Sequence, residues 1–339
     1  MRTSTALLCL VVALVATACN GGGDNTANGG TQSGGSGAAK KYTIAVIPKG
    51  QTHEYWKSVH EGANKAAAEL GDVDLDWKGP EKENDRDEQI KIVEDFTTQG
   101  VSGIVLAPLD NKALGSPIQD AIHNNIPVVV IDSGVDTSGY LSYVATDNEK
   151  GGEQAGDYLA KLLGGKGRVM MMRYEEGSAS TDDRERGFME SMKKNPGIVV
   201  VSSDQYGGAT VDSAMKTAEN LIGAHKKGDG LDVDGIYTPN ESTTMGMLET
   251  LRGERVAGKV KFVGFDASEK LIDGLNKGEI NGLIIQNPRE MGYDGVKFIE
   301  QYLKNHTSPP AKVDTGATLL TKDNEAQPEV AALIAPPKD

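Results

Sequence analysis

The chain has 339 residues, a formal net charge of −14 and a sequence pI of about 4.9. This acidic balance argues against a nucleic-acid partner and against binding of the folded body to anionic lipid surfaces. Both cysteines, Cys9 and Cys19, precede the region with strand and helix patterns. We therefore expect no disulfide, thiolate metal site or cysteine nucleophile in the folded body.

The N-terminal segment predicts export. Arg2 precedes an apolar run over residues 6–18, which ends in small residues directly before Cys19. A run this short is typical of a signal peptide rather than of a membrane-spanning helix. The string LVATAC resembles the lipobox of bacterial lipoproteins, which implies a signal peptide over residues 1–18 and a lipid-modified Cys19. An ordinary secretory signal with an incidental cysteine is the alternative.

Residues 19–41 are predicted to form a tether, because they are almost wholly Gly, Ser, Thr, Asn and Ala after Cys19. Such a composition cannot bury a core and behaves as a flexible coil, with a root-mean-square span of roughly 25 Å for twenty residues. We expect an extracytoplasmic protein that lipid chains anchor to the bacterial cell membrane, facing the periplasm or the cell surface.

From Tyr42 onward, short apolar runs alternate with amphipathic segments. Uniformly apolar strands between helices are typical of a parallel sheet that is covered on both faces, so the predicted fold class is doubly wound α/β. The predicted strands cover residues 42–47, 103–106, 127–131, 140–145, 167–172, 198–203, 234–238, 260–265 and 282–286. Helical patterns cover residues 53–70, 86–99, 209–226 and 288–304.

A weak internal repeat indicates two similar α/β halves. GIVLAPLDN at 103–111 resembles GIYTPNEST at 235–243, and a strand that ends in Asp-Ser or Asp-Ala-Ser follows each of them. Ligands of open α/β sheets bind beyond the carboxyl ends of the strands. Asp132, Asn240 and Asp266 follow such strands, so they would line one cleft if the two halves face each other.

Common enzyme motifs are absent from the sequence. There is no phosphate-binding loop, no glycine-rich dinucleotide motif after the first strand, no G-x-S-x-G and no H-E-x-x-H. His53 and His60 could share a helix face, but the sequence offers no third ligand to complete a metal site. We therefore expect a protein that is not an enzyme and has neither a metal nor a cofactor.

The polar and aromatic residues near the strand ends suit sugar recognition. Carboxylates accept hydrogen bonds from hydroxyl groups, arginine donates several, and aromatic rings pack against the apolar faces of a sugar. Each residue also has a structural alternative, as a helix cap, a core aromatic or a solvated charge. The candidates are Tyr55, Trp56, Asp132, Arg184, Tyr206, Asn240, Asp266 and Gln286.

A family resemblance covers residues 42–320. The chain resembles the periplasmic sugar-binding proteins of the ribose- and galactose-binding type, which are relatives of the ligand-binding half of lac-type repressors. This resemblance implies a type I periplasmic binding protein with two doubly wound domains, joined by three hinge crossovers near residues 145–147, 286–287 and 314–316. The motifs that carry it are KYTIAVIPKG, THEYWKSVHEGA, GIVLAPLD, IPVVVIDS, VATDNEKGGEQAGDYLAKLL, ASTDDRERGF, GIYTPNE, FVGFDAS and LIIQNPREMG.

The implied N-terminal lobe comprises residues 42–146 and 287–314, and the C-terminal lobe comprises residues 147–286 and 315–339. All eight candidates above match ligand-binding positions of the ribose-binding pattern. The chain departs from that pattern at Lys49, His53 and Ser133, which puts ribose itself in doubt. Lys49 could meet an anionic ligand group, or it could form a salt bridge to Asp132 or Glu54.

The resemblance implies a monomeric receptor that binds a small-molecule sugar or polyol and delivers it to an ABC permease. Because Lys49 and Arg184 balance Asp132 and Asp266, with His53 expected to be neutral near pH 7, we favour a neutral ligand over a sugar acid. The alternative function is presentation of the sugar to a chemoreceptor or sensor kinase. An exported enzyme is disfavoured for lack of a nucleophile–base pair, and the export signal excludes a transcription factor.

Overall fold

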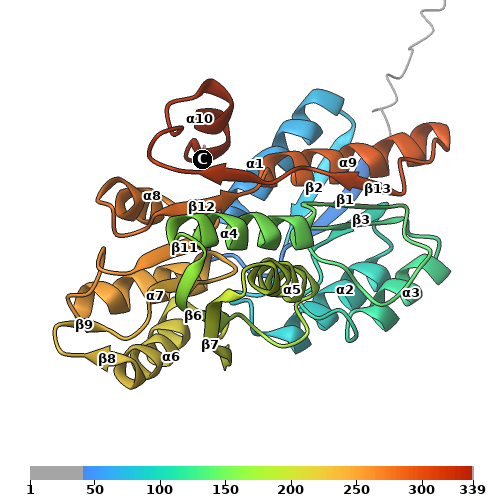
Figure 1. Cartoon of the computed structure of the whole chain (residues 1–339). Coiled ribbons are helices and arrows are strands. Elements are labelled where there is room, and N and C mark those ends of the chain that lie inside the picture. Colours follow the sequence, from blue (N-terminus) through green and yellow to red (C-terminus); the bar gives the residue numbers. More distant parts are fainter. Residues whose placement is uncertain (1–40, 338–339) are drawn as a thin grey trace, which may run out of the picture. The chain divides into compact units, whose positions relative to one another are not determined.

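The structure, a computed structural model, describes residues 41–337 (Figure 1). The predicted signal peptide (residues 1–18), the predicted lipid-bearing Cys19 and the tether apart from Lys41 lie outside the described residues. Within the described range, no helix is both long and apolar enough to cross a membrane.

The first sheet has the strand order β13-β5-β4-β3-β1-β2, and all its pairings are parallel. Helices α1 and α9 pack on one face, and α2 and α3 pack on the other. The strands are β1 (Tyr42–Ile47), β2 (Val73–Trp77), β3 (Gly103–Leu106), β4 (Val128–Ile131), β5 (Ser142–Ala145) and β13 (Lys312–Asp314). The helices are α1 (Glu54–Leu70), α2 (Arg86–Gln99), α3 (Gly115–His123) and α9 (Pro288–Asn305).

The second sheet has the order β14-β12-β11-β10-β6-β7, with β14 antiparallel to β12. Helices α4 and α5 cover one face, and α6, α7 and α8 cover the other. The strands are β6 (Lys166–Arg173), β7 (Gly197–Tyr206), β10 (Gly235–Tyr237), β11 (Lys261–Phe265), β12 (Gly282–Ile285) and β14 (Thr318–Leu320). The helices are α4 (Asn148–Leu162), α5 (Ala179–Lys194), α6 (Val211–Ala224), α7 (Glu241–Gly253) and α8 (Glu269–Asn276).

The central strands are buried on both faces. In β1, Ile44 and Val46 pack under α1 and α9, whereas Ala45 and Ile47 pack under α2 and α3. A strand that contacts helices on both sides must be apolar at every position, which explains its continuous apolar sequence. The topology confirms the predicted doubly wound α/β fold.

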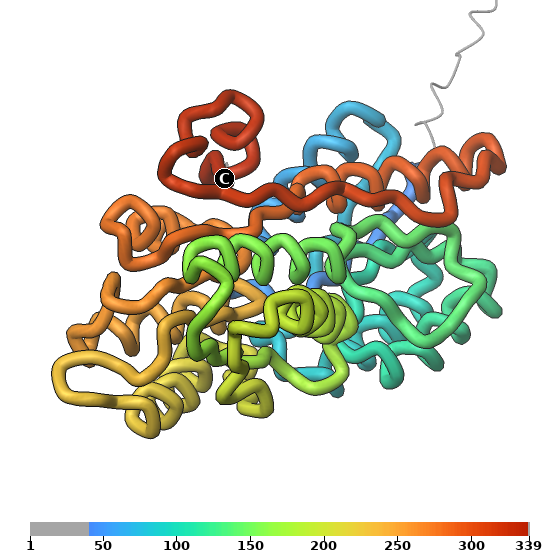
Figure 2. The backbone as a smooth tube through the Cα atoms, viewed as in Figure 1, coloured from blue at the N-terminus to red at the C-terminus, as the bar shows by residue number. Residues whose placement is uncertain are grey.

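The chain passes between the two sheets three times, after β5, after β12 and after β13 (Figure 2). We call the first sheet with its helices the N-terminal lobe, and the second sheet with its helices the C-terminal lobe. A short hairpin, β8 (Lys226–Lys227) and β9 (Gly230–Leu231), follows α6, and the C-terminal helix α10 (Pro328–Ile334) follows β14.

A glycine contact fixes the position of helix α5. A Cβ atom on Gly152 of α4 would lie 1.9 Å from the backbone oxygen of Arg184 in α5, so only glycine fits there. The two helices can therefore approach closely, and this contact sets the backbone position of Arg184.

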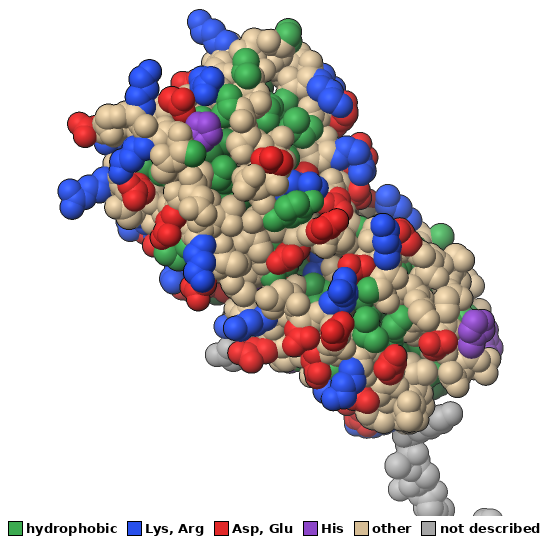
Figure 3. All heavy atoms as spheres, turned by 90° about the horizontal axis from the view of Figure 1, so that it is seen from below, with side chains coloured by type: hydrophobic (Ala, Val, Ile, Leu, Met, Phe, Trp, Pro, Cys, Tyr) green, Lys and Arg blue, Asp and Glu red, His purple; other side chains and the backbone are tan. Residues whose placement is uncertain are grey.

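Charged side chains of both signs are interspersed over the face of the molecule in Figure 3. In the C-terminal lobe, Arg252 of α7 forms partly exposed ion pairs with Glu249, Asp273 and Glu279. Each exposed pair of this kind contributes about 0–1 kcal/mol. The buried layers on both faces of each sheet, rather than these pairs, hold the fold together.

Candidate functional site

Two buried aspartates occupy equivalent positions in the two lobes. Asp132 follows β4 and Asp266 follows β11, and both have a positive φ, of 62° and 69°. Aspartate tolerates this left-handed conformation better than most residues. Because each aspartate directly follows a central parallel strand, both lie at the carboxyl end of a strand, where α/β proteins bind their ligands.

Asp132 is held by two cleft residues of its own lobe. The Nζ atom of Lys49 lies 3.1 Å from its carboxylate, and the hydroxyl of Tyr55 donates a 2.8 Å hydrogen bond to it. Lys49 also donates to the hydroxyls of Ser178 and Ser180 in the C-terminal lobe, at 3.2 and 3.1 Å. Of the two alternatives for Lys49, the structure therefore shows the salt bridge to Asp132.

Glu83 is a buried carboxylate at the centre of the polar contacts in the N-terminal lobe. Its oxygens contact His53 Nδ1 and accept a hydrogen bond from Trp56 Nε1 at 2.5 Å. The hydroxyl of Tyr174 donates to the same carboxylate from the C-terminal lobe, also at 2.5 Å. Glu83 therefore links the two lobes as well as two of the predicted site residues.

The pair of His53 and Glu83 corrects one expectation. Burial favours neutral histidine, but the Glu83 carboxylate outweighs it and raises the pKa of His53 to about 9. Burial also opposes ionisation of Glu83, but His53, Tyr174 and Lys49 lower its pKa to about 2. His53 is therefore charged at pH 7, and the expectation of a neutral His53 was wrong because the sequence did not reveal its buried partner.

Each of the three guanidinium nitrogens of Arg184, in α5, donates one hydrogen bond. It donates to Asn148 at 2.8 Å, to the Pro239 carbonyl at 3.0 Å and to Gln286 at 2.9 Å. Its guanidinium carbon lies 4.0 Å from the ring centroid of Phe265. Because these partners come from four separate elements, the tertiary fold fixes the planar group in one orientation.

Asp266 is bound to two neighbouring residues. Gln286 donates to one of its carboxylate oxygens at 2.6 Å, and the backbone N–H of Glu241 donates to the other at 3.0 Å. Burial raises the pKa of Asp266 although Arg184 opposes this shift. Burial, with a further contribution from Asp266, also raises the pKa of Glu241 to about 7, against the effect of His53.

Asn240 has two structural roles: it is the N-cap of α7, and its side chain borders the space between the lobes. Its side-chain oxygen accepts the backbone N–H of Thr243 at 3.3 Å, in a capping box, and its amide donates to Ser242 at 3.1 Å. The helix-cap alternative therefore holds for Asn240, and its side chain still borders the cavity described next.

These side chains enclose a cavity of about 30 Å³ between the lobes. Small-molecule sites usually have volumes of about 300–1,000 Å³, so this cavity is far smaller than a usual ligand site. The two lobes are in contact and the polar groups of the cleft bind one another. The lining residues are Lys49, His53, Tyr55, Trp56, Glu83, Asp132, Tyr174, Ser180, Thr181, Arg184, Asn240, Glu241, Asp266 and Gln286.

Two predicted site residues do not line this cavity. Ser133 is fully buried, and its hydroxyl accepts the backbone N–H of Ser180 at 3.1 Å, which joins the lobes beside the cavity. Tyr206, at the end of β7, is 38% exposed and stacks on Arg173, with 4.4 Å between the guanidinium carbon and the ring centroid. The structure thus places Tyr206 outside the cavity lining.

Sequence reasoning missed several lining residues, namely Glu83, Tyr174, Ser180, Thr181 and Glu241. Glu83 follows β2, a strand that was not predicted because aspartates alternate with its apolar residues. Glu241 directly follows Asn240 and could have been found from that position. Among residues 41–337, no group of three or more potential ligands is arranged to hold a metal ion.

The periplasmic binding protein domain family matches residues 44–307 of the chain. The ribose import binding protein RbsB of Escherichia coli is 29% identical over 273 residues, which cover 79% of this chain and 86% of that protein. Another relative, the D-ribose/D-allose-binding protein of Pseudomonas aeruginosa, is 27% identical over 83% of this chain and 89% of its own length.

Solved structures give the same result. A carbohydrate transporter solute-binding protein from Agrobacterium radiobacter, in complex with D-arabinose, has a TM-score of 0.82 and 34% identity, covering 88% of this chain and 100% of its own. An ABC transporter solute-binding protein from Agrobacterium vitis, with bound D-fucose, has a TM-score of 0.82 and 29% identity, over 86% and 99% of the two chains. The chain therefore belongs to the periplasmic binding protein family, and its relatives are sugar-binding components of ABC transporters.

Proposed function

We propose that this protein is the lipid-anchored, extracytoplasmic receptor of an ABC importer for a neutral monosaccharide or polyol. The observation that carries this proposal is the arrangement of Asp132, Asp266 and Arg184 around one cavity between two lobes. Tyr55 and Trp56 border the same cavity. These residues supply directional acceptors, fixed donors and flat apolar surfaces, which together suit the hydroxyls and ring faces of a sugar.

The balance of charge supports a neutral ligand. Lys49, His53 and Arg184 are matched by Asp132, Glu83 and Asp266 within the cavity lining. The fourth carboxylate of the lining belongs to Glu241, whose pKa burial raises to about 7. An ionised ligand group would be buried without a counterion, at a cost of several kcal/mol. A sugar hydroxyl can instead replace one of the existing polar contacts while every charge keeps a partner.

Entry of a sugar requires the lobes to separate, because the cavity in the closed arrangement is so small. We propose that residues 42–146 with 287–314, and 147–286 with 315–339, move as two rigid lobes about the three crossovers. The ligand would then favour closure through contacts that only the closed arrangement provides.

The relatives support a transport role. Their names describe ribose import and binding of sugars for ABC transporters, and the family is extracytoplasmic. We propose that Cys19 carries the lipid anchor and that the monomer hands its sugar to an ABC permease without altering it. Presentation of the sugar to a chemoreceptor or sensor kinase is the competing outcome.

A binding screen tests the ligand class. Thermal shift followed by calorimetry would compare neutral pentoses, hexoses and polyols with matched sugar acids. A ligand at 100 times its dissociation constant stabilises the folded protein by about 2.7 kcal/mol, which such a screen detects. We expect at least one neutral compound to bind and its acid counterpart to bind more weakly. Exclusive binding of sugar acids, or binding of neither class, would reject the proposal.

Two further measurements test anchoring and transport. Mass spectrometry of protein from its native membrane should show a mature chain that begins with lipid-modified Cys19. Deletion of the gene should abolish uptake of the identified sugar. Loss of the response to the sugar with normal uptake would favour the sensory alternative.

A further inference from the structure

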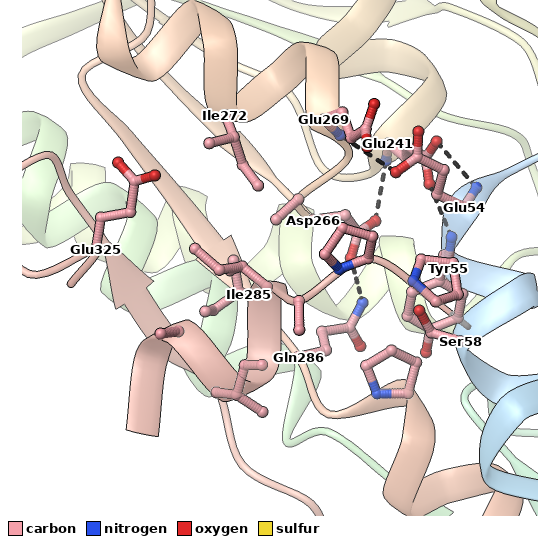
Figure 4. Close-up of a pocket in the computed structure, with 18 of the residues that line it drawn as sticks. Glu54, Tyr55, Ser58, Glu241, Asp266, Glu269, Ile272, Ile285, Gln286 and Glu325 are labelled. Atoms are coloured by element: carbon pink, nitrogen blue, oxygen red, sulfur yellow. Dashed lines mark hydrogen bonds between the residues drawn. The ribbon is translucent and has the colours of Figure 1, made fainter. Parts of the chain in front are cut away.

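A second, much larger cavity lies beside the sugar cleft (Figure 4). Its volume is about 640 Å³, within the range of 300–1,000 Å³ that is usual for small-molecule sites. Its walls come from the first turns of α1, from the segment that begins at Asp266 and continues into α8, and from the C-terminal residues after β14. The proposed monosaccharide site does not account for this space.

The two sides of the cavity differ in chemistry. Glu54, Glu241 and Glu269 gather at one end, and Ile272 and Ile285 project along the middle (Figure 4). The C-terminal segment adds further apolar surface through Leu333, Ile334, Pro336 and Pro337. A site of this kind favours a ligand group that is largely apolar and carries a hydrogen-bond donor or a positive charge.

The C-terminal wall is fixed in place by specific contacts. Arg289 of α9 donates to the carbonyl oxygens of Leu333 and Ala335, at 3.3 and 2.5 Å, and pairs with Glu61 at 2.6 Å. Val330 of α10 is 2% exposed and belongs to the core of the C-terminal lobe. The segment is thus held by both lobes, and the cavity beneath it is a built feature of the fold.

The second cavity and the sugar cleft have a common border. Tyr55, Glu241, Asp266 and Gln286 line both of them. The hydrogen bond from Gln286 to Asp266, at 2.6 Å, lies in this border (Figure 4). A sugar whose hydroxyl replaces this contact would place a substituent on a neighbouring ring atom beside the larger cavity.

We propose that the second cavity is a subsite for the aglycone of a glycoside, and that it accepts a neutral or cationic apolar group and disfavours an anionic one. This inference rests on the proposed sugar-binding function and extends it to larger ligands. The described lining contains five carboxylates and one ammonium group, that of Lys322, which donates to the carbonyl of Asn276 at 3.1 Å. The charge of the described lining therefore repels an anionic substituent.

Calorimetry with matched glycosides tests the subsite. The neutral sugar that binds best in the screen would be compared with its benzyl, 4-aminomethylbenzyl and 4-carboxybenzyl glycosides, each in both anomeric forms. We expect one anomer of the first two glycosides to bind about tenfold more tightly than the free sugar, because the aromatic ring is buried. The carboxybenzyl glycoside should bind more weakly than both. Equal or weaker binding of all glycosides would overturn the proposal.

Variants that fill the cavity provide the control. Ile272→Trp and Ile334→Trp, on different elements, should remove the gain from the benzyl group while affinity for the free sugar stays within twofold. Ile272→Ala, which leaves the space open, should retain the gain. If glycoside binding survives both tryptophan variants, the aglycone lies elsewhere. If no free sugar binds, the proposed function fails before the subsite is tested, so the two failures are distinguishable.

Discussion

Glu241 of α7 accepts the backbone N–H of Tyr55 in the first turn of α1, at 3.2 Å, so a carboxylate of one lobe caps a helix of the other. Its second oxygen accepts the backbone N–H of Glu54 at 3.3 Å. The relationship is reciprocal, because the Glu54 carboxylate accepts the backbone N–H of Glu269 at the start of α8, at 3.2 Å. These contacts hold the lobes together through groups other than Asp132 and Asp266, the carboxylates that we propose bind the sugar.

We predict that Glu54→Ala weakens sugar binding by about twofold to fivefold. A carboxylate at a helix N-terminus contributes about 0.3–1 kcal/mol, and this one acts only when the lobes are closed. Calorimetry and stopped-flow measurements should show that most of the loss is in the dissociation rate. The matched control is Glu269→Ala, which keeps the backbone N–H and should bind as wild type. Equal effects of both variants would contradict the role of the cap.

We predict that Lys49→Met lowers affinity for a neutral sugar by more than about tenfold, because loss of one partner of a buried charge pair typically costs 2–5 kcal/mol. The variant leaves Asp132 without its cation and removes the contacts to Ser178 and Ser180 across the cleft. Calorimetry with neutral and acidic sugars would measure this. Lys57→Met, at an exposed position of α1, is the control. Tight binding of an acidic sugar that only Lys49→Met abolishes would show that Lys49 serves an anionic ligand.

The stability of the protein should depend on pH through four buried groups, of which three act above pH 4.5. Burial raises the pKa of Glu185 to about 7 against the effect of Arg173, and raises the pKa of Glu241 to about 7 against the effect of His53. Burial lowers the pKa of His53, but Glu83 outweighs it and raises that pKa to about 9. For the two glutamates, stabilisation is full below their ordinary value of 4.5 and is lost as the pH rises through about 7. For His53, stabilisation is full below 6.5 and is lost as the pH rises through about 9.

We therefore predict that the free energy of unfolding is largest near pH 5 and decreases toward pH 9. Glu83 acts in the opposite range, because its lowered pKa stabilises the fold above pH 4.5 and this effect is lost as the pH falls through about 2. Urea unfolding at several pH values would measure the profile. Glu185→Gln should flatten the slope between pH 5 and 7, whereas the surface variant Glu190→Gln should not. A stability that rises from pH 5 to 8 would show the assignment to be wrong.

We predict that Arg184→Lys lowers sugar affinity by more than about tenfold, because lysine cannot reproduce a planar group with three separate bonded directions. Asn148, Pro239 and Gln286 would compete for one ammonium group. In contrast, Tyr206→Ala should leave affinity within about twofold, since Tyr206 does not line the cavity. If Tyr206→Ala lost sugar binding, the result would support the contact between Tyr206 and the ligand that the family resemblance predicted.

We predict that Gly152→Ala destabilises the fold by about 1–3 kcal/mol, the usual cost of overpacking. The added methyl would clash with the backbone of Arg184, so sugar affinity should fall as well. The control is Gly223→Ala in α6, where no atom lies within 4 Å of the new Cβ. That variant should be neutral or stabilising by about 0.4–1 kcal/mol. Thermal unfolding and calorimetry on both variants would separate clash from helix propensity.

The sequence alone predicted the doubly wound fold because the central strands are apolar at every position. Each strand from Tyr42–Ile47 to Gly282–Ile285 that lies inside a sheet overlaps a predicted strand. The edge strands β2, β13 and β14 were missed because they are short or because charged residues alternate with their apolar ones. The fourth edge strand, β7, was predicted from its continuous apolar run. Because β2 was missed, Glu83, which follows it, was not among the candidates.

Strand ends and family motifs in the sequence identified most of the residues that line the cavity, because parallel strands end at the same edge of a sheet. Only the tertiary structure decided the partners of those residues. Lys49 pairs with Asp132, and His53 is charged because Glu83 approaches it from a loop thirty positions away. The second cavity arises where the C-terminal segment crosses from Val330 to Arg289 of the other lobe. Contacts between distant segments depend on how the two lobes and the C-terminal segment are placed, and no local pattern in the sequence encodes that placement.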